Sequence, residues 1–283
     1  MNDYLLSILL GVIEGLTEFL PVSSTAHLRI AEALLGVNLD DGYWKMFSIV
    51  IQLGAILCLP ILFSQRIASF FATFPQGRRG NRTVMTHPLT LTLLAFVCTA
   101  APAFLLKKVI GKNLENLVLM GAALVVGGII MWAVDAMYAS RGSIEDVEEM
   151  SFGQAIWIGC CQVLSAVVPG TSRSMSTIAA GQIAGLTRAA ALEFSFLLSI
   201  PTMAAATGYD LLKYLKPSHG EPPPHIDAHG WMLLAIGFVV SFLVAWAVVA
   251  WFMHWVRKHG FVPFAIYRII AGLAVLAWAM KVI

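Results

Sequence analysis

The sequence predicts an all-α polytopic membrane protein, on three observations. Of the 283 residues, 59% are hydrophobic and 12% are charged, whereas soluble domains carry roughly 25% charged residues. The mean hydropathy is +0.81, and apolar residues gather in stretches of roughly 20, the length that a helix needs to cross the hydrocarbon layer. Segments of about ten alternating apolar and polar residues, typical of a membrane β-barrel, are absent from the sequence. A soluble enzyme is therefore not expected.

Six stretches are long and apolar enough to cross a membrane as helices. These predicted spans are residues 43–63, 88–108, 115–137, 189–213, 231–256 and 261–282. Two further hydrophobic regions, residues 2–36 and 152–186, are each interrupted near the middle by a proline and a run of hydroxyl residues. Proline ends a helix, and a hydroxyl residue can cap the next one. Each interrupted region is therefore predicted to form a helix, a polar turn and a second short helix.

The two interrupted regions resemble each other. Four positions recur at a constant offset: Gly11, Leu16, Pro21 and Ser24 in the first region, and Gly159, Leu164, Pro169 and Ser172 in the second. Each region precedes three predicted spans, so the second unit is upside down if each region enters and leaves on one side. We predict a single integral membrane domain, residues 1–283, built from inverted repeats over residues 1–140 and 150–283. Its six transmembrane helices and two re-entrant helix pairs would bring the two turns together near the bilayer midplane.

The charges between the spans bear on orientation and partners. Residues 64–87 carry four arginines and no acid, which favours the cytoplasmic side by the positive-inside rule. Lys107, Lys108 and Lys112 on the opposite side weaken this assignment. The segment Glu221–His225 contains three prolines and is predicted to be a stiff exposed loop. A net charge of +2 is too balanced to indicate a nucleic-acid partner, so none is expected.

Two carboxylates lie in the first interrupted helix. Glu14 and Glu18 are four residues apart, so they share a helical face and one divalent cation can contact both. A carboxylate inside the membrane costs about 2.5 to 3.5 kcal/mol on insertion scales, which favours a functional role. The alternatives are a pair wetted at the membrane surface, or a pairing with an internal arginine.

Hydroxyl and imidazole groups follow the first turn, at Ser23, Ser24, Thr25 and His27. A helix N-terminus offers free N–H groups and a positive dipole end, which favour phosphate binding. A histidine near a serine can act as general base or as proton donor to a leaving group. In the alternative interpretation, Ser23 is only a helix cap and His27 only a hydrogen-bonded core histidine.

The second turn, Thr171–Ser174, adds a positive charge at Arg173. Arginine is always protonated, and its forked donors match phosphate oxygens. An ion pair with Glu14 or Glu18 is the structural alternative, and it is compatible with binding because the arginine can exchange a carboxylate for substrate. If the two turns meet, they form one polar pocket suited to hydrolysis of a lipid-linked phosphate, with Mg²⁺ or a similar ion neutralising charge.

Other polar residues within the spans are weaker signals. Glu193 is expected either to support the pocket or to form an ion pair at a helix end. Gln52 more often serves interhelical hydrogen bonding than a site. Tyr267 and Arg268, near the start of the last span, are expected to be interface anchors.

Five motifs carry a family resemblance that covers nearly the whole chain. They are residues 14–27 (EGLTEFLPVSSTAH), 51–56 (IQLGAI), 169–174 (PGTSRS), 193–198 (EFSFLL) and 263–268 (PFAIYR). In these motifs the sequence resembles the undecaprenyl-pyrophosphate phosphatase family, also called bacitracin resistance proteins. Two positions depart from the family pattern: Met175 stands where a glycine is usual, and Ser48 where an acid is usual.

The resemblance implies a multi-pass enzyme of the bacterial inner membrane, with its site facing the periplasm. It would hydrolyse the polyprenyl pyrophosphate to its monophosphate, recycling the lipid carrier of peptidoglycan synthesis. The family's dependence on a divalent cation implies Mg²⁺ or Ca²⁺ as cofactor. The functional residues carried over are Glu14, Glu18, Ser24, His27 and Arg173.

Our prediction is that the isoprenoid tail lies between helices, among membrane lipids, while the pyrophosphate sits at the two helix N-termini. Arg173 and a cation on Glu14 and Glu18 would hold it, with further contacts from Ser23, Thr25, Thr171, Ser172 and Ser174. The nucleophile stays open between Ser24 activated by His27 and a water activated by His27 or a glutamate. A secondary transporter or lipid flippase is the principal rival hypothesis, and a structural scaffold ranks last. Both a monomer and a homodimer are compatible with the sequence.

Overall fold

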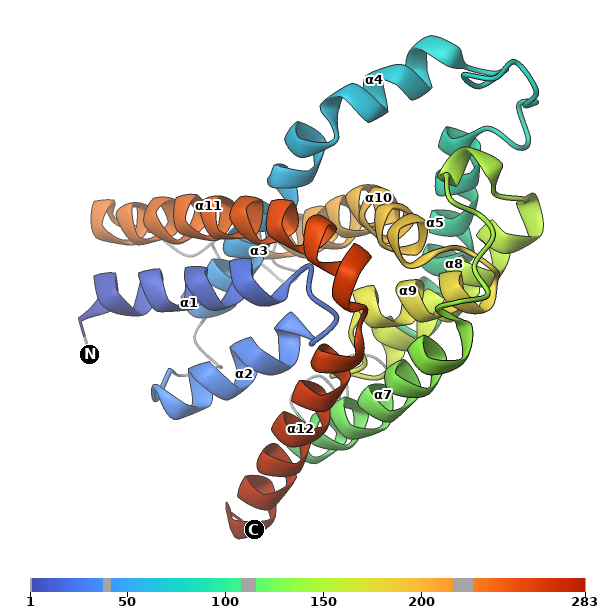
Figure 1. Cartoon of the computed structure of the whole chain (residues 1–283). Helices are drawn as coiled ribbons and strands as arrows, with labels where there is room; N and C mark the ends of the chain where they lie inside the picture. Colours follow the sequence, from blue (N-terminus) through green and yellow to red (C-terminus); the bar gives the residue numbers. More distant parts are fainter. Residues whose placement is uncertain (1, 38–41, 108–115, 216–225, 283) are drawn as a thin grey trace.

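The structure is a computed structural model that describes residues 2–37, 42–107, 116–215 and 226–282. Within these ranges six helices are long and apolar enough to cross a membrane. They are α3 (Gly42–Leu62), α5 (Pro88–Leu105), α7 (Leu117–Tyr138), α10 (Arg188–Leu215), α11 (Ala228–His259) and α12 (Val262–Val282). The prediction of an all-α polytopic membrane protein is confirmed (Figure 1). Lys108, Lys112 and the proline-rich segment 221–225 lie outside the described residues, so their predicted roles stay predictions.

Both interrupted regions form a helix, a turn and a second helix. The first gives α1 (Asp3–Thr17) and α2 (Ser24–Leu34), and the second gives α8 (Phe152–Val167) and α9 (Arg173–Ile183). The residues immediately before α2 and α9 are Ser23 and Ser172. Ser172 is therefore the structural counterpart of Ser23, not of Ser24, because the second turn has one more residue after its proline.

One end of the helix bundle is where α1 and α11 begin, and we call it the α1 end. There the Tyr4 hydroxyl lies 3.2 Å from His229 Nδ1. Helix α11 then runs to the opposite end, where the N–H of Phe261 donates to Asp135 at the end of α7 (3.0 Å). Asp135 also accepts two hydrogen bonds from Arg188, the first residue of α10 (2.7 Å each).

The second helix pair, α8 and α9, begins at this opposite end, which we call the α8 end. The Gln154 side chain, in the first turn of α8, donates to the Ala184 carbonyl at the end of α9 (2.7 Å). The next residue, Gly185, accepts from the Ser143 N–H in the loop after α7 (3.0 Å). The pair α1–α2 and the pair α8–α9 thus enter the bundle from opposite ends. The inverted repeat and the re-entrant insertion in a membrane stay predictions with which this arrangement agrees.

Helix α1 packs on α11, which packs on α3; α8 packs on α5, and α7 on α12. Glycines that recur in the two sequence repeats allow the closest approaches. A Cβ at Gly11 would lie 2.9 Å from the Gly237 carbonyl of α11, and a Cβ at Gly159 would collide with the Ala95 carbonyl of α5. The recurring glycine is thus explained by helix contact, since a larger residue would force both pairs apart.

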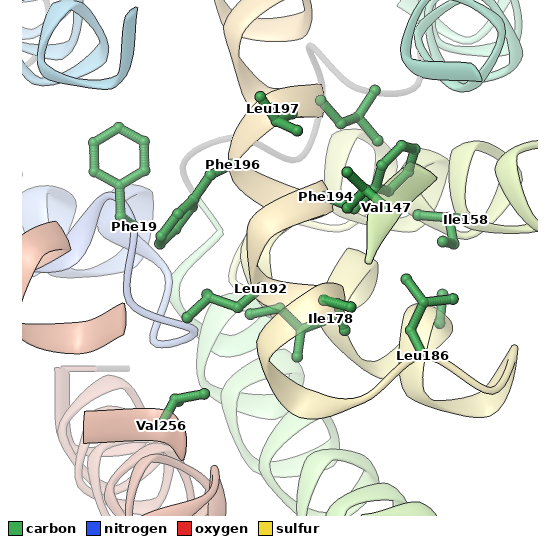
Figure 2. Close-up of a cluster of buried hydrophobic side chains, with 14 of the residues drawn as sticks. Phe19, Val147, Ile158, Ile178, Leu186, Leu192, Phe194, Phe196, Leu197 and Val256 are labelled. Carbon is green, nitrogen blue, oxygen red and sulfur yellow. The ribbon is translucent and has the colours of Figure 1, made fainter. Parts of the chain in front are cut away.

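A continuous apolar core lies beside the turns (Figure 2). Phe19, which follows Glu18, is fully buried and meets Phe196 of α10 edge to face, with ring centroids 5.6 Å apart. Such aromatic pairs add about 0.5 to 1.5 kcal/mol beyond their burial. The first turn is thereby fixed against α10, and the functional groups that it carries are fixed with it.

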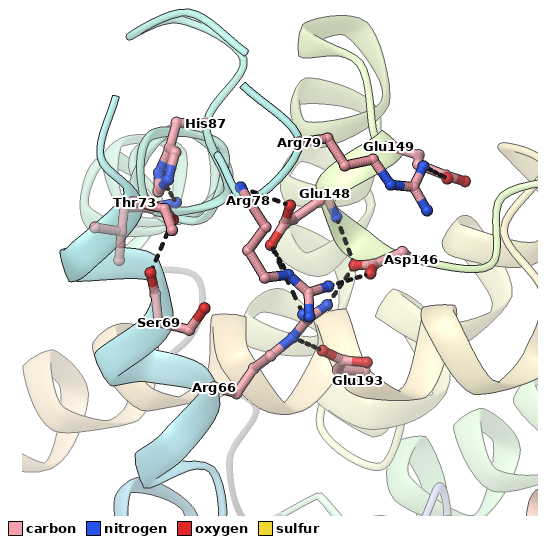
Figure 3. A network of polar contacts seen from close by, with 11 residues as sticks. Arg66, Ser69, Thr73, Arg78, Arg79, His87, Asp146, Glu148, Glu149 and Glu193 are labelled. Carbon is pink, nitrogen blue, oxygen red and sulfur yellow. Dashed lines mark hydrogen bonds and ion pairs between the residues drawn. The ribbon is translucent and has the colours of Figure 1, made fainter. Parts of the chain in front are cut away.

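An ionic network closes the α8 end (Figure 3). Arg66, in the first turn of α4 (Ser64–Thr73), pairs with Glu193 of α10 at 2.8 Å and also with Asp146. Burial alone would raise the pKa of Asp146, but the Glu148 N–H and the guanidinium groups of Arg66 and Arg78 lower it below its usual value. Glu193 therefore belongs to an ion pair at a helix end, the second of its two expected roles, and does not line the pocket.

Candidate active site

Both turns hold a serine in a conformation that side chains rarely adopt. Ser23 has φ 75° and Ser172 has φ 72°, and they are the non-glycine residues with positive φ among the described part of the chain. Such residues cost of order 1 to 3 kcal/mol each and cluster at functional sites. The Ser172 hydroxyl caps α9 by accepting from the Met175 N–H (3.3 Å), whereas the Ser23 side chain makes no capping bond.

The two turns converge on one carboxylate. Glu18, the residue after α1, accepts a hydrogen bond from Arg173 Nη2 at 3.0 Å through Oε1. Its other oxygen, Oε2, accepts from the Ser24 hydroxyl at 2.5 Å. Glu18 is 6% exposed and the Arg173 side chain 12%, so this is an ion pair largely removed from water. The expected pairing of Arg173 with one of the two glutamates is confirmed for Glu18.

A polar cavity of about 220 Å³ lies between the turns. Its wall includes six of the predicted residues: Glu18, Ser23, Ser24, Thr25, Ser172 and Arg173. Gln52 of α3 also lines it, as do Ser165 of α8 and Thr202 of α10. Gln52, which sequence reasoning assigned mainly to interhelical bonding, does both, because its Oε1 lies 3.3 Å from the Thr207 hydroxyl.

Three buried polar atoms beside the cavity have no partner among the described residues. They are both carboxylate oxygens of Glu14, which is fully buried, and Nη1 of Arg173. An unsatisfied buried charged group is costly, and such groups mark ligand or metal sites in native proteins. Carboxylate oxygens are typical ligands of Mg²⁺ or Ca²⁺, and a free guanidinium N–H can donate to a phosphate oxygen.

His27 bonds other groups than the serine that it was expected to activate. Its Nδ1 is 2.7 Å from the Ser23 carbonyl, and its Nε2 is 2.6 Å from the Tyr267 hydroxyl. A carbonyl can only accept, so Nδ1 carries a proton, and in the neutral imidazole Nε2 accepts from Tyr267. The imidazole therefore makes no hydrogen bond to Ser24 in this arrangement.

Two other predicted residues lie near the cavity but outside its wall. Ser174 is buried, with its hydroxyl 3.5 Å from the Glu18 carbonyl. Thr171 faces a separate, almost wholly apolar cavity of about 450 Å³ between α7, α8 and α9, which Met175 also lines. Ser48, at the position where the family usually has an acid, donates to Glu32 (2.8 Å).

The expectation that Tyr267 and Arg268 are interface anchors was wrong for Arg268. Its side chain is fully buried and donates to backbone carbonyls of both turns. Tyr267 is 46% exposed but bonds His27. Their position at the start of an apolar helix is typical of an anchor, and the only contrary signal was the cost of an arginine in a span.

Comparison with known proteins identifies the family. The family model described as bacitracin resistance protein BacA matches residues 7–274. The chain belongs to this family. The undecaprenyl-diphosphatase of Koribacter versatilis (strain Ellin345) is 69% identical over 99% of this chain and 100% of its own length. Proteins of the same name from Persephonella marina and Thermus thermophilus are 39% and 40% identical, over 97% and 93% of this chain and 98% and 92% of theirs.

Two motifs that are distant in the sequence meet at the cavity. The motif at residues 14–27 supplies Glu18 and Ser24, and the motif at residues 169–174 supplies Arg173. The two motifs are far apart in the chain, yet a single carboxylate joins them.

Proposed function

We infer that this chain is an undecaprenyl-diphosphatase. It hydrolyses undecaprenyl diphosphate to undecaprenyl phosphate and inorganic phosphate, which recycles the lipid carrier for cell-wall synthesis and gives resistance to bacitracin. The observation that carries the assignment of the site is the meeting of Arg173, Glu18 and Ser24 beside unused buried donors and acceptors. The full-length similarity to undecaprenyl-diphosphatases supports the substrate.

The cavity binds the diphosphate through positive groups from both turns. The first N–H groups of α2 and α9 have no partner within their helices, and each helix directs its positive dipole end toward the cavity. Arg173 Nη1 adds a free donor, while Nη2 holds Glu18. Because these groups are fixed before substrate binds, they stabilise the charge that develops in the transition state without reorganising.

Ser24 is the nucleophile in this proposal, with Glu18 as its base. The 2.5 Å hydrogen bond gives Glu18 direct access to the hydroxyl proton, which His27 lacks. The serine oxygen bonds to the terminal phosphorus as the bond to the bridging oxygen breaks, and undecaprenyl phosphate leaves. Glu18 takes the hydroxyl proton in this step. Water then attacks the phosphorus of the phosphoserine and leaves as part of inorganic phosphate, which keeps the water protons, while Glu18 returns its proton to the Ser24 oxygen. His27 orients the first turn through the Ser23 carbonyl.

A divalent cation, Mg²⁺ or Ca²⁺, fits the unpartnered oxygens of Glu14 and the adjacent carboxylate of Glu18. When bound, it would neutralise charge on the diphosphate. We predict that Glu14→Gln raises the cation concentration for half-maximal activity about tenfold, because carboxylate charge sets cation affinity. The same variant should lose the cation-induced rise in Tm measured without substrate.

Glu148→Gln is the matched control for the cation experiment. Glu148 is also a buried carboxylate, but it belongs to the ionic network at the α8 end, where it pairs with Arg78 (2.6 Å). It should leave the half-maximal cation concentration unchanged. Equal cation titrations for Glu14→Gln and the native protein would remove the cation site from the proposal.

The apolar cavity is the site proposed for the first isoprene units of the substrate. Thr171 lines it, while the neighbours Gly170 and Ser172 line the polar cavity, so headgroup and tail would lie on either side of one peptide segment. We predict that Met175→Trp lowers kcat/KM for undecaprenyl diphosphate about tenfold relative to farnesyl diphosphate, the range in which apolar pockets discriminate. Met85→Trp, at an exposed methionine outside this cavity, is the control. An unchanged ratio of the two substrates would place the tail elsewhere.

The arginine-rich α8 end is proposed to face the cytoplasm of a bacterial inner membrane. The polar cavity is proposed to face the periplasm, as the family resemblance implies. A homodimer stays a hypothesis, tested by the mass of the protein in detergent. Labelling of single cysteines from each side of intact cells would test the orientation.

The function is tested by incubating the purified protein in detergent with undecaprenyl diphosphate and measuring released phosphate. An enzyme needs no sealed bilayer for this reaction. Lipid movement in sealed vesicles with no phosphate release in detergent would instead support the rival flippase.

A further inference from the structure

Arg268 is a fully buried cation that the proposed reaction does not use. Its Nη1 donates to the Pro21 carbonyl of the first turn at 3.0 Å. Its Nη2 donates to the Gly170 and Thr171 carbonyls of the second turn at 3.1 and 3.0 Å, and to Ala123 of α7 at 3.1 Å. Among the described residues, no carboxylate forms an ion pair with it. A single guanidinium group therefore holds both turns by their backbone.

The bonds to the second turn determine where its amides point. A trans peptide has its C=O and N–H on opposite sides. The Gly170–Thr171 peptide is held on both sides, by Arg268 at its carbonyl and by Val168, which accepts from the Thr171 N–H (3.2 Å). In the next peptide the Thr171 carbonyl faces Arg268, so the Ser172 N–H points away from it. Ser172 lines the polar cavity and caps the helix that begins with Arg173.

The first turn is fixed in the same way. The Pro21 carbonyl bonds Arg268, and the N–H of the same peptide, on Val22, donates to the Leu20 carbonyl (2.8 Å). The next residue after Val22 is Ser23, with its positive φ, and Ser24 follows it. One cation thus fixes the peptides that precede both helix N-termini.

The guanidinium group of Arg268 packs closely against α7. A Cβ added at Gly127 of α7 would collide with Arg268 Nη2. Arginine suits the position because its planar fork can serve several separate acceptors, whereas an ammonium group is a compact point charge.

We propose that Arg268 is a positioning residue for diphosphate hydrolysis: it joins the two turns through their carbonyls, directs the Ser172 N–H away from itself, and keeps Ser24 and Arg173 in register. This inference rests on the proposed function. Arg268 touches neither substrate nor reacting atoms.

The test uses the full-length protein in detergent, with kcat, KM and Tm measured for each variant. Arg268→Lys should lower kcat about 100-fold when the variant is assayed below its own Tm. This is the size of effect that a misplacement of about 1 Å can have. Gly127→Ala, which keeps the charge and displaces the guanidinium, should lower kcat about tenfold for undecaprenyl and farnesyl diphosphate alike, whereas narrowing of the apolar cavity, which Gly127 also lines, would change the ratio of the two substrates. Because Gly127→Ala keeps Arg268 itself, it provides an answer if Arg268→Lys does not fold.

Arg188→Lys is the matched control, since Arg188 also holds helices together but touches neither turn. It should lower Tm and leave kcat unchanged while the protein is folded. If Arg268→Lys and Gly127→Ala lower only Tm, as the control does, Arg268 is merely structural and the inference is wrong. If the native protein itself releases no phosphate, the proposed function fails instead, so the two failures are distinguishable.

Discussion

Replacing Arg173 by alanine is expected to lower kcat/KM for undecaprenyl diphosphate about 10³-fold, the upper range for loss of one transition-state donor. Two effects combine. The substrate loses the free Nη1 donor, and Glu18 loses its charged partner in a nearly dry site. A buried carboxylate that loses its charged partner is destabilised in its place, so Glu18 is no longer held where it accepts the Ser24 proton. Phosphate release in detergent provides the measurement.

Arg173→Lys should recover part of this loss, because it restores the charge but not the fork. A double-mutant cycle with Glu18→Gln separates the two effects. If Arg173 acts partly through Glu18, the double variant is less impaired than the product of the single losses predicts. A value of kcat/KM within tenfold of the native protein for Arg173→Ala would exclude Arg173 as the phosphate-binding group.

Ser24→Ala is expected to lower kcat about 10⁴-fold or more, because a covalent route ends when its nucleophile is removed. Acid quenching of the native protein during turnover, followed by mass spectrometry, should detect phosphate on Ser24. The control is Ser165→Ala. Ser165 lines the same cavity, but its hydroxyl donates back to Gln162 of its own helix (2.7 Å), and we assign it no role.

Full activity of Ser24→Ala would make water the nucleophile. Glu18 would then be the base for that water, since among the described residues it is the carboxylate that lines the cavity. His27→Ala should be much milder than Ser24→Ala in either case, because His27 bonds the Ser23 carbonyl and Tyr267 rather than Ser24.

Elements with strong periodicity or a clear break were predictable from the sequence. Apolar length identified the six spans. Pro21 and Pro169 identified the two turns because hydroxyl residues that can cap a following helix accompany each of them, whereas Pro60, Pro102 and Pro201 lie inside helices. Because buried charges need partners, the sequence indicated an ion pair of Arg173 with Glu14 or Glu18, and the structure shows it with Glu18.

Contacts that depend on helix packing were not predictable. Arg268 looked like a surface anchor because its neighbours are apolar, and only the fold brings two turns above it. His27 is three residues from Ser24 in sequence, but its ring turns toward Tyr267 of α12, a distant segment. Glu193 was expected either at the pocket or in an ion pair, and Arg66 of α4, far away in the sequence, decided for the ion pair.

Ser24 opens α2 and Arg173 opens α9, so one architectural slot carries an alcohol in one half of the molecule and a permanent cation in the other. Two identical halves could not furnish both. The chemistry therefore depends on the halves having diverged at that slot: swapping their opening residues would not regenerate the centre, because the acid that links them, Glu18, belongs to only one of the pair.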